Sequence, residues 1–189
     1  IADLDTGDIF IVSSGVNVTA LAVTNFIAST GTSNSGTVTL NADETGNIDM
    51  SLSSSGDYNI IGGSGSNILK GSSGADTFTI SASGEGNSDV FDGGAGADVL
   101  KLSTGSHVFS SDTNFANIET IEANTAGSSV NLSAQTEGFT ITGYEGIDIL
   151  RGGKGNDIIS SDGAYDVLYG GDGDDNLTGG SENDELSGG

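Results

Sequence analysis

The sequence predicts an all-β fold, a solenoid of short parallel strands, and three observations lead to this prediction. Residues 143–187 consist of one nine-residue unit repeated five times without a gap, as GYEGIDILR, GGKGNDIIS, SDGAYDVLY, GGDGDDNLT and GGSENDELS. Residues 1–52 alternate in short β-like runs without helical periodicity. Glycine is abundant, with 32 residues among 189, and proline is absent. Short strands separated by glycine-rich turns are therefore expected.

The nine-residue unit follows the pattern GGxGxDxUx, in which U is apolar. Glycine at positions one, two and four permits the tight bending of a turn, and positions seven to nine form a short strand. Side chains alternate along a strand, so the residue at position eight points inward and its two neighbours point outward. A single strand of this length buries almost nothing. The units are therefore expected to stack into an array that buries a continuous ladder of Leu and Ile.

Aspartate holds position six in all five copies. If two units complete one turn of the solenoid, Asp148, Asp166 and Asp184 share one edge, and Asp157 and Asp175 share the other. Neighbouring coils lie about 4.8 Å apart. Two carboxylates at so short a separation repel each other unless a cation lies between them. Ca²⁺ is a hard cation that takes six to eight oxygen ligands and fits such a site. The repeats contain no His or Cys, which argues against zinc or copper.

The repeat pattern divides the chain into four segments. We expect a leading β-rich solenoid segment at 1–52, a first repeat block at 53–101, a motif-poor β spacer at 102–142 and a second repeat block at 143–189. Four extra residues, 80–83, interrupt the first block. Leu132 and Ile141 already hold the nine-residue spacing that leads into the second block. The spacer is therefore predicted to continue the solenoid with metal-free coils. A small cap or a helical excursion near residues 114–119 is the alternative.

The composition limits the possible partners. The net charge is −23, and the chain has only four basic residues, so nucleic acid is excluded as a partner and binding to an anionic membrane is disfavoured. No apolar run reaches the roughly 18 residues of a membrane-spanning helix, so no direct membrane insertion is expected. No N-terminal signal peptide is visible. The chain starts at Ile1 and stops two residues into a sixth repeat, so we expect a fragment of a longer protein.

The sequence supports a catalytic or a phosphate-binding function less well than it supports calcium binding. The glycine loops contain no GxxxxGK[ST] motif, and an acidic residue closes most of them. The only histidine, His107, lies in the spacer and is predicted to be a plain surface or spacer residue. GxSxG and HExxH motifs are absent. Acidic pairs such as Asp174-Asp175 could suggest a glycosidase, but they lie inside the calcium pattern. No enzymatic activity is predicted for this chain.

The two repeat blocks resemble the RTX (repeats-in-toxin) family of secreted bacterial proteins, whose nonapeptide is a known signature of a calcium-binding parallel β-helix. This resemblance covers roughly half of the chain. It implies a right-handed parallel β-roll and export by a type I system with a C-terminal signal. The segment VTNFIASTGTSNSGTVTL, Val23 to Leu40, is similar in composition to the Ser/Thr/Ala/Gly-rich solenoid of RTX-type surface-layer proteins.

The resemblance also implies the calcium ligands. In the family, each site is formed by two repeats that lie two units apart. The first repeat supplies the carbonyls at positions two and four and its position-six Asp. The second repeat supplies the carbonyls at positions one and three and its own position-six Asp. In the second block this gives three sites: Gly153, Gly155, Asp157, Gly170, Asp172 and Asp175; Tyr144, Gly146, Asp148, Ser161, Gly163 and Asp166; and Asp162, Ala164, Asp166, Gly179, Ser181 and Asp184. In the first block it gives Ser72, Gly74, Asp76, Gly93, Ala95 and Asp98, if residues 80–83 loop out, and a poorer site at Gly63, Gly65, Asn67, Gly84, Gly86 and Asp89. Asn67 replaces a carboxylate there, which should weaken calcium binding.

These features together predict a calcium-binding structural module of a secreted bacterial cell-surface protein. The expected role is a surface-layer or adhesin scaffold that folds on binding several Ca²⁺ ions after export. The expected partners are calcium and copies of itself or other cell-surface components. The alternative is the C-terminal folding and secretion module of an RTX hydrolase or toxin whose catalytic domain lies outside this chain. The full-length sequence would discriminate between the two.

Overall fold

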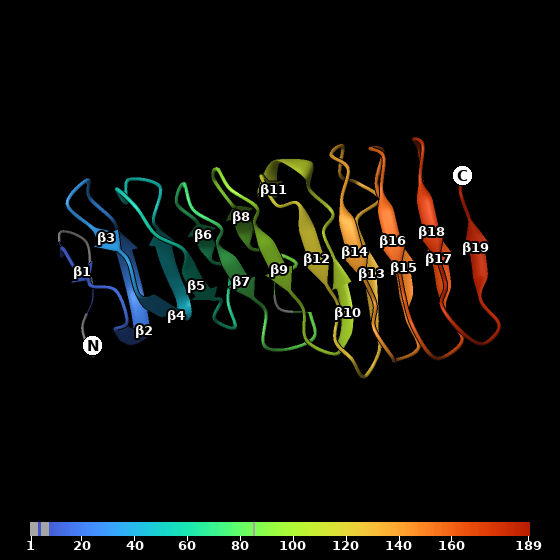
Figure 1. The fold of residues 1–189 in the computed structure, drawn as a ribbon, viewed down its shortest axis with the longest axis horizontal. Coiled ribbons are helices and arrows are strands. Elements are labelled where there is room, and N and C mark those ends of the chain that lie inside the picture. The colour runs from blue at the N-terminus through green and yellow to red at the C-terminus, as the bar shows by residue number, and fades with distance from the viewer. Residues whose placement is uncertain (1–3, 5–7, 85) are drawn as a thin grey trace.

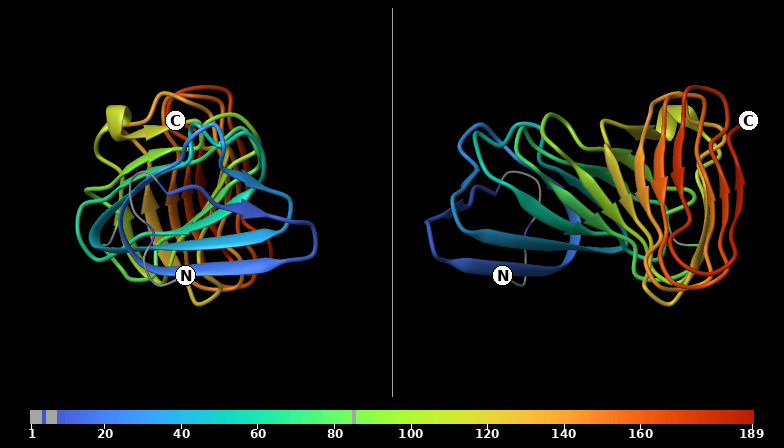
Figure 2. Two further views of the ribbon diagram at one scale, coloured as in Figure 1. Left: turned by 90° about the vertical axis from the view of Figure 1, so that its left-hand side faces the viewer. Right: turned by 45° about the vertical axis from the view of Figure 1, so that its right-hand side comes forward.

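The chain winds as a parallel β-solenoid in the computed structural model, which describes residues 4, 8–84 and 86–189 (Figure 1). The first residues of the leading segment and Glu85 of the fourth repeat lie outside the described residues. Successive coils stack side by side from the N-terminal to the C-terminal end, and each described strand pair is parallel (Figures 1 and 2). The prediction of an all-β solenoid is confirmed.

Most strands are three residues long, and in the repeats they occupy positions seven to nine as predicted. The strands are β1 (Ile11–Val12), β2 (Asn17–Ile27), β3 (Ser33–Asn34), β4 (Thr37–Asp49), β5 (Tyr58–Ile61), β6 (Ile68–Lys70), β7 (Thr77–Thr79), β8 (Val90–Asp92), β9 (Val99–Lys101), β10 (Gly105–Val108), β11 (Phe115–Ala116), β12 (Thr120–Glu122), β13 (Ser128–Asn131), β14 (Thr140–Thr142), β15 (Ile149–Arg151), β16 (Ile158–Ser160), β17 (Val167–Tyr169), β18 (Asn176–Thr178) and β19 (Glu185–Ser187). One short 3₁₀ helix, η1 (Asp112–Asn114), precedes β11.

Two ladders of strands form the walls of the solenoid. One runs from β4 through β5, β7, β9, β12, β14 and β16 to β18. The other runs from β4 through β6 and β8 to β11, and a separate five-stranded sheet runs from β10 through β13, β15 and β17 to β19. In the second block, Leu150 pairs with Leu168 and Ile159 with Leu177, each eighteen residues apart. Two nine-residue units therefore complete one turn, as predicted.

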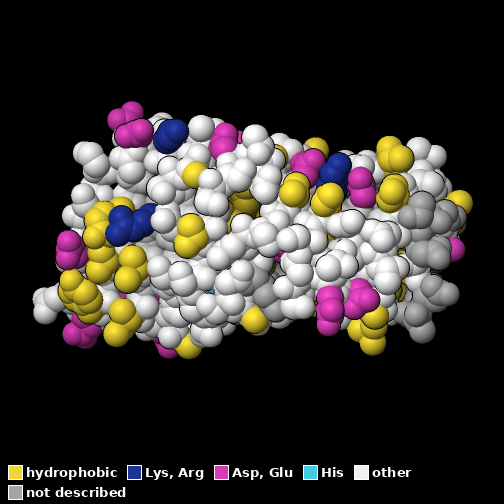
Figure 3. Space-filling view, turned by 180° about the vertical axis from the view of Figure 1, so that it is seen from behind, with side chains coloured by type: hydrophobic (Ala, Val, Ile, Leu, Met, Phe, Trp, Pro, Cys, Tyr) yellow, Lys and Arg dark blue, Asp and Glu magenta, His cyan; other side chains and the backbone are white. Residues whose placement is uncertain are grey.

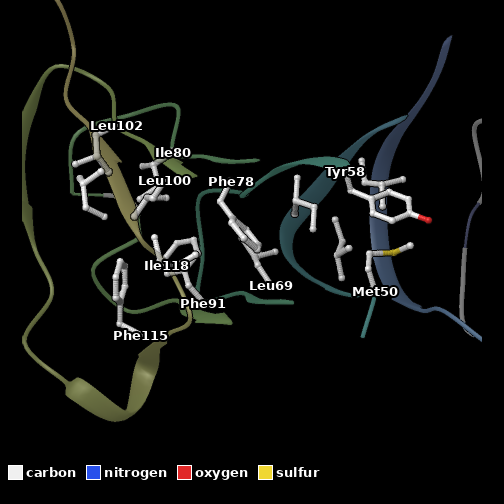
Figure 4. Packing of buried hydrophobic residues seen from close by; sticks show 14 of the residues in the cluster. Met50, Tyr58, Leu69, Phe78, Ile80, Phe91, Leu100, Leu102, Phe115 and Ile118 are labelled. Atoms are coloured by element: carbon white, nitrogen blue, oxygen red, sulfur yellow. The ribbon is translucent and has the colours of Figure 1, made fainter. Parts of the chain in front are cut away.

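The core is the ladder of position-eight side chains. Leu69, Phe78, Leu100 and Leu150 are fully buried, and Figure 4 shows how the first three follow one another along the inside of the coil. Phe78 and Phe91 meet edge to face at 5.8 Å between ring centroids. Since each buried three-residue strand of the repeats has only one inward side chain, a single coil buries little by itself, so each coil depends on its neighbours.

The leading segment differs from the short runs that its sequence predicts. Its sequence predicts separate short runs at 37–40 and 47–52, but residues 37–49 form the single thirteen-residue strand β4, and residues 50–52 follow it. Residues Val38–Asn41 of this strand pair with β5, and Ile48 and Asp49 pair with β6. β4 therefore passes from one wall to the other without the glycine turn of the repeats. It pairs on its other side with β2, and the register between them shifts near Val23.

The spacer continues the solenoid, as predicted, through β10 to β14. Instead of the helical alternative near residues 114–119, the chain has η1, one 3₁₀ turn, followed by the short strand β11. Two expectations are corrected. His107 is no surface residue: it takes the inward position opposite Val130 and is fully buried. Ile80 does not loop out: its N–H bonds the Lys101 carbonyl and its side chain is buried, whereas residues 81–83 are exposed.

Candidate metal sites

A ladder of carboxylates follows each edge of the second block. The backbone N–H of Asp157 donates a hydrogen bond to Oδ1 of Asp175 at 2.9 Å. On the other edge, the N–H of Asp148 donates to Oδ1 of Asp166 at 2.8 Å, and the N–H of Asp166 to Oδ1 of Asp184 at 3.0 Å. Each position-six Asp therefore faces the position-six residue one coil away. The predicted division of the five aspartates between two edges is confirmed.

The turns of residues 152–157 and 170–175 bring oxygen atoms together. Oδ2 of Asp157 accepts the N–H of Gly153 at 2.8 Å. A Cβ added to Gly152 would collide with this same Oδ2 and with the carbonyl of Gly170. Two oxygens of the proposed ligand set, one from each coil, therefore converge beside a glycine where a larger residue would not fit.

The carbonyls predicted as ligands from positions two and four lie beneath the facing turn. The Gly153 carbonyl accepts the N–H of Asp172 at 3.1 Å, and a Cβ on Gly171 would collide with it. A Cβ on Gly173 would collide with the carbonyl of Gly155. The structure thus places all six predicted residues of this site on two turns in direct contact, although their role as ligands remains a prediction.

The opposite edge carries two more such arrangements. The Tyr144 carbonyl accepts the N–H of Asp162 at 2.8 Å, and the Ser161 hydroxyl donates to Oδ2 of Asp166 at 2.7 Å. One coil further, the Ser181 hydroxyl donates to the carbonyl of Gly163 at 3.3 Å. The remaining predicted residues of this edge, Gly146, Ala164 and Gly179, lie on the same stacked turns.

The first block repeats this arrangement across its four-residue insertion. The N–H of Asp76 donates to Oδ1 of Asp98 at 2.7 Å, and the N–H of Ala95 donates to the Ser72 carbonyl at 3.1 Å. A Cβ on Gly71 would collide with the Gly93 carbonyl and would come close to Oδ2 of Asp76. Gly96, with φ of +144°, lies against the carbonyl of Gly74 in the same way.

The poorer site of the first block is arranged differently. The N–H of Asn67 donates to Oδ1 of Asp89 at 2.8 Å, but the Asn67 amide donates to the Gly46 carbonyl at 2.7 Å. The N–H of Gly84 bonds the carbonyl of Ser106, and the Gly86 carbonyl accepts the N–H of Asp89 within its own turn. Gly63 and Gly65 pack against residues 43–44. The insertion thus separates Gly84 from the turn that it was predicted to face.

Several side-chain oxygens at these sites are buried without a hydrogen-bond partner. They include Oδ2 of Asp98, of Asp148 and of Asp175, together with Oδ1 of Asn67. Burial raises the pKa of Asp148 to about 7. The hydrogen bond from the Ser128 N–H lowers this pKa in part, and repulsion from the Asp166 carboxylate raises it. Burial likewise raises the pKa of Asp76 to about 6. Buried, unpaired carboxylate oxygens are costly, and a cation relieves that cost.

The donor set fits calcium. Within the described residues no group of three His, Cys, Asp or Glu side chains converges on one point, so each site offers at most two carboxylates and must draw its other oxygens from the main chain or water. Ca²⁺ accepts such mixed, flexible oxygen sets. Zinc and copper prefer nitrogen and sulphur ligands, which the repeats lack.

Comparison with known families decides the identity of the repeats. A family model described as the RTX calcium-binding nonapeptide repeat matches in four copies, at residues 54–79, 81–105, 140–168 and 165–189, which together cover more than half of the chain. The chain belongs to the RTX calcium-binding nonapeptide repeat family. No curated protein and no solved structure matches the chain.

Membership in the RTX repeat family carries general properties. RTX nonapeptide repeats bind calcium, and their β-roll is a structural rather than a catalytic fold. They are typical of secreted proteins. In the part of the chain that the structure describes, no helix is long and apolar enough to cross a membrane. The chain is therefore a calcium-binding structural module.

The nine-residue motif does not identify the residues that take position six in the spacer. The N–H of Asp98 donates to Oε2 of Glu119 at 2.8 Å, and the N–H of Ser128 donates to Oδ1 of Asp148 at 2.7 Å. Glu119 stands two residues before the buried Ile121, as each Asp stands two residues before its apolar residue. That spacing is the only signal in the sequence, because the glycines that mark a repeat are missing.

Proposed function

We propose that this chain is a scaffold segment of a secreted bacterial cell-surface protein, in a surface layer or an adhesin, and that it folds when several Ca²⁺ ions bind after export. The observation that carries this proposal is the stacked position-six aspartates. Each uses one carboxylate oxygen to bond the neighbouring coil, and Asp148 and Asp175 keep the other oxygen buried and unpaired.

The folding switch follows from charge and entropy. With 32 glycines, the unfolded chain is costly to order, and a net charge of −23 adds self-repulsion in the compact form. Each bound Ca²⁺ adds two positive charges and joins neighbouring coils, so its binding free energy contributes to folding. Extracellular calcium modules bind at about 10⁻⁴–10⁻³ M, which keeps the chain unfolded at cytosolic calcium levels and folded outside the cell.

The surface supports a scaffold rather than a catalytic role. His107, the only histidine, is buried in the wall of the solenoid. A hollow of about 550 Å³ is lined by small polar side chains together with Ile80, Leu102 and Ala123, and also by Lys101, Glu122 and Tyr144. Figure 3 shows acidic side chains near the margins of one face and apolar side chains gathered towards the C-terminal end.

Exposed apolar side chains on the second block support contact with copies of itself or other surface components. Ile147 is 64% exposed, and it lines a hollow with Ile149 beside Gly127. Sedimentation velocity in millimolar calcium should show association that Ile147→Asp weakens. A monomer at all concentrations would remove self-association from the proposal.

Circular dichroism tests the folding switch. The chain is measured in EGTA and again in millimolar Ca²⁺, with Mg²⁺ as the control for ionic strength and divalent charge. We expect a largely disordered spectrum in EGTA and in Mg²⁺, and a cooperative gain of β structure in Ca²⁺. A full β spectrum in EGTA would refute folding on calcium binding, even if calcium still bound.

A further inference from the structure

A carboxylate continues the ladder of the first block beyond its last repeat. The N–H of Asp98 donates to Oε2 of Glu119 at 2.8 Å, as the N–H of Asp76 donates to Oδ1 of Asp98 at 2.7 Å. Glu119 belongs to the spacer and lies outside every stretch that the repeat family matches. The third member of this edge ladder is thus an acid that no repeat motif assigns.

The residue at position one of this coil is Asn117. The N–H of Gly93 bonds the carbonyl of Ala116 at 3.0 Å, and Asn117 is the next residue. A Cβ on Gly93 would collide with the carbonyl of Asn117 and would come close to Oδ2 of Asp98.

The same pair of oxygens marks a repeat site in the second block. The N–H of Gly152 bonds the carbonyl of Tyr169 at 2.9 Å, and Gly170 is the next residue. A Cβ on Gly152 would collide with the carbonyl of Gly170 and with Oδ2 of Asp157. The arrangement around Gly93 therefore reproduces the one around Gly152, although its facing turn has no nonapeptide sequence.

The facing turn is shorter, and the longer acid compensates. Two residues lead from Asn117 to Glu119, whereas five lead from Gly170 to Asp175. Glutamate has one methylene more than aspartate, which extends its carboxylate back to Asp98. Asn117 adopts φ of +54°, and its side-chain amide donates to Oδ1 of Asp92 at 2.7 Å, so the short turn has a fixed shape.

The pocket holds an unpartnered buried acid. Asp98 is only 1% exposed, and its Oδ2 has no hydrogen-bond partner. Glu119, by contrast, is exposed, so the outer side of the pocket is open to water. An isolated buried carboxylate oxygen is costly, and a second carboxylate nearby increases that cost. A hard cation held between the two acids, with water on its open side, would satisfy both groups.

We propose that Asp98, Glu119 and the carbonyl of Asn117 hold a further Ca²⁺ ion at the junction between the first repeat block and the spacer. This inference rests on the proposed function, because both require the chain to bind calcium. It departs from the expectation that the spacer coils bind no metal. An ion here would tie β9 to β12 and carry calcium-dependent order past the last repeat of the first block.

Native mass spectrometry of the whole 189-residue chain tests this site by counting bound Ca²⁺. Glu119→Gln keeps an oxygen that can accept the N–H of Asp98 but removes the charge. Glu137→Gln is the matched control, because Glu137 is an exposed spacer acid on a neighbouring turn. At saturating calcium, Glu119→Gln should bind one ion fewer than the wild type, and Glu137→Gln should bind the same number.

The outcomes separate this inference from the proposed function. If the wild type binds several ions and Glu119→Gln binds as many, the junction site is wrong and the calcium-binding scaffold stands. If the wild type binds none, both are wrong. Should Glu119→Gln fail to fold in calcium, anomalous diffraction from wild-type crystals soaked with Tb³⁺ decides. A peak within about 2.6 Å of both Oδ2 of Asp98 and a carboxylate oxygen of Glu119 supports the site, and its absence overturns it.

Discussion

The backbone N–H of Asp157 donates a hydrogen bond to Oδ1 of Asp175, which lies eighteen residues further along the chain. The second oxygen of Asp175, Oδ2, is buried without a partner. One side chain thus performs two tasks: one oxygen fixes the spacing of two coils, and the other remains available to a cation. This division explains why position six favours a short acid over an amide.

Replacing Asp175 by Asn should separate the two tasks. The amide oxygen can still accept the N–H of Asp157, but the negative charge is lost. The calcium midpoint for folding, followed by circular dichroism, should rise by at least about tenfold, which is the low end of the cost of removing even second-shell support from a metal site. Asp174→Asn removes the same charge from an exposed neighbour and should shift the midpoint far less. Equal midpoints for the two variants would contradict the assignment.

The metal-free chain should gain order on acidification. Burial raises the pKa of Asp148 to about 7 and that of Asp76 to about 6, above the value near 3.9 of an unfolded aspartate. The folded state therefore binds protons more tightly than the unfolded state. The stability from these groups is fully present below about pH 4 and is lost as the pH rises through 6 to 7.

Circular dichroism in EGTA between pH 4.5 and 8, as chosen conditions, checks this dependence. The β signal should be larger at the acid end, and added calcium should have its greatest effect at the alkaline end, where the carboxylates are ionised. A metal-free spectrum that does not change over this range would show that the buried aspartates do not limit folding.

Gly171 should not tolerate a side chain. It adopts φ of +117°, and a Cβ there would collide with the carbonyl of Gly153. Gly171→Ala should cost at least about 1–2 kcal/mol from the backbone conformation alone, with a further loss from the displaced carbonyl. Gly188 has no atom near its Cβ position, so Gly188→Ala is the control and should have little effect. Thermal unfolding in calcium measures both, and equal melting temperatures would count against the turn geometry.

The inward ladder should dominate the stability of the calcium-bound form. Leu150 is fully buried between Val130 and Leu168 in the paired strands, so Leu150→Ala should cost about 2–5 kcal/mol. Leu186, at the same repeat position, is 45% exposed on the last described coil, and its replacement by Ala should cost clearly less. Chemical denaturation in saturating calcium compares them. A similar loss at both positions would mean that stacking does not set the stability of each coil.

The repeat motif alone was sufficient to predict the strands of both blocks and the sharing of aspartates between two edges. The reason is physical: one apolar residue in every nine must be buried, and stacking with two units per turn aligns these residues and the aspartates of alternate units. Leu150 and Asp157 could therefore be placed without coordinates. The ligand roles of these residues, by contrast, remain a prediction.

Other features follow from contacts that sequence patterns do not encode. Ile80 is the first residue of an insertion, yet its side chain fills the core because the register of β7 against β9 is kept. His107 takes an inward position that repeats reserve for apolar residues, with its Nε2 near the Ser103 carbonyl at 3.0 Å. Glu119 reaches its position through a shortened turn. Each depends on the neighbouring coil, about twenty residues away in the sequence.

The most direct test of the account is the location of the ions in crystals of the chain grown in millimolar calcium, by anomalous diffraction at long wavelength. The account predicts a peak between the turns of residues 153–157 and 170–175, within about 2.6 Å of carboxylate oxygens of both Asp157 and Asp175. Ordered coils with no ion at that position, or with ions bound only at exposed acids such as Asp174, would contradict the claim that calcium joins turns two repeats apart.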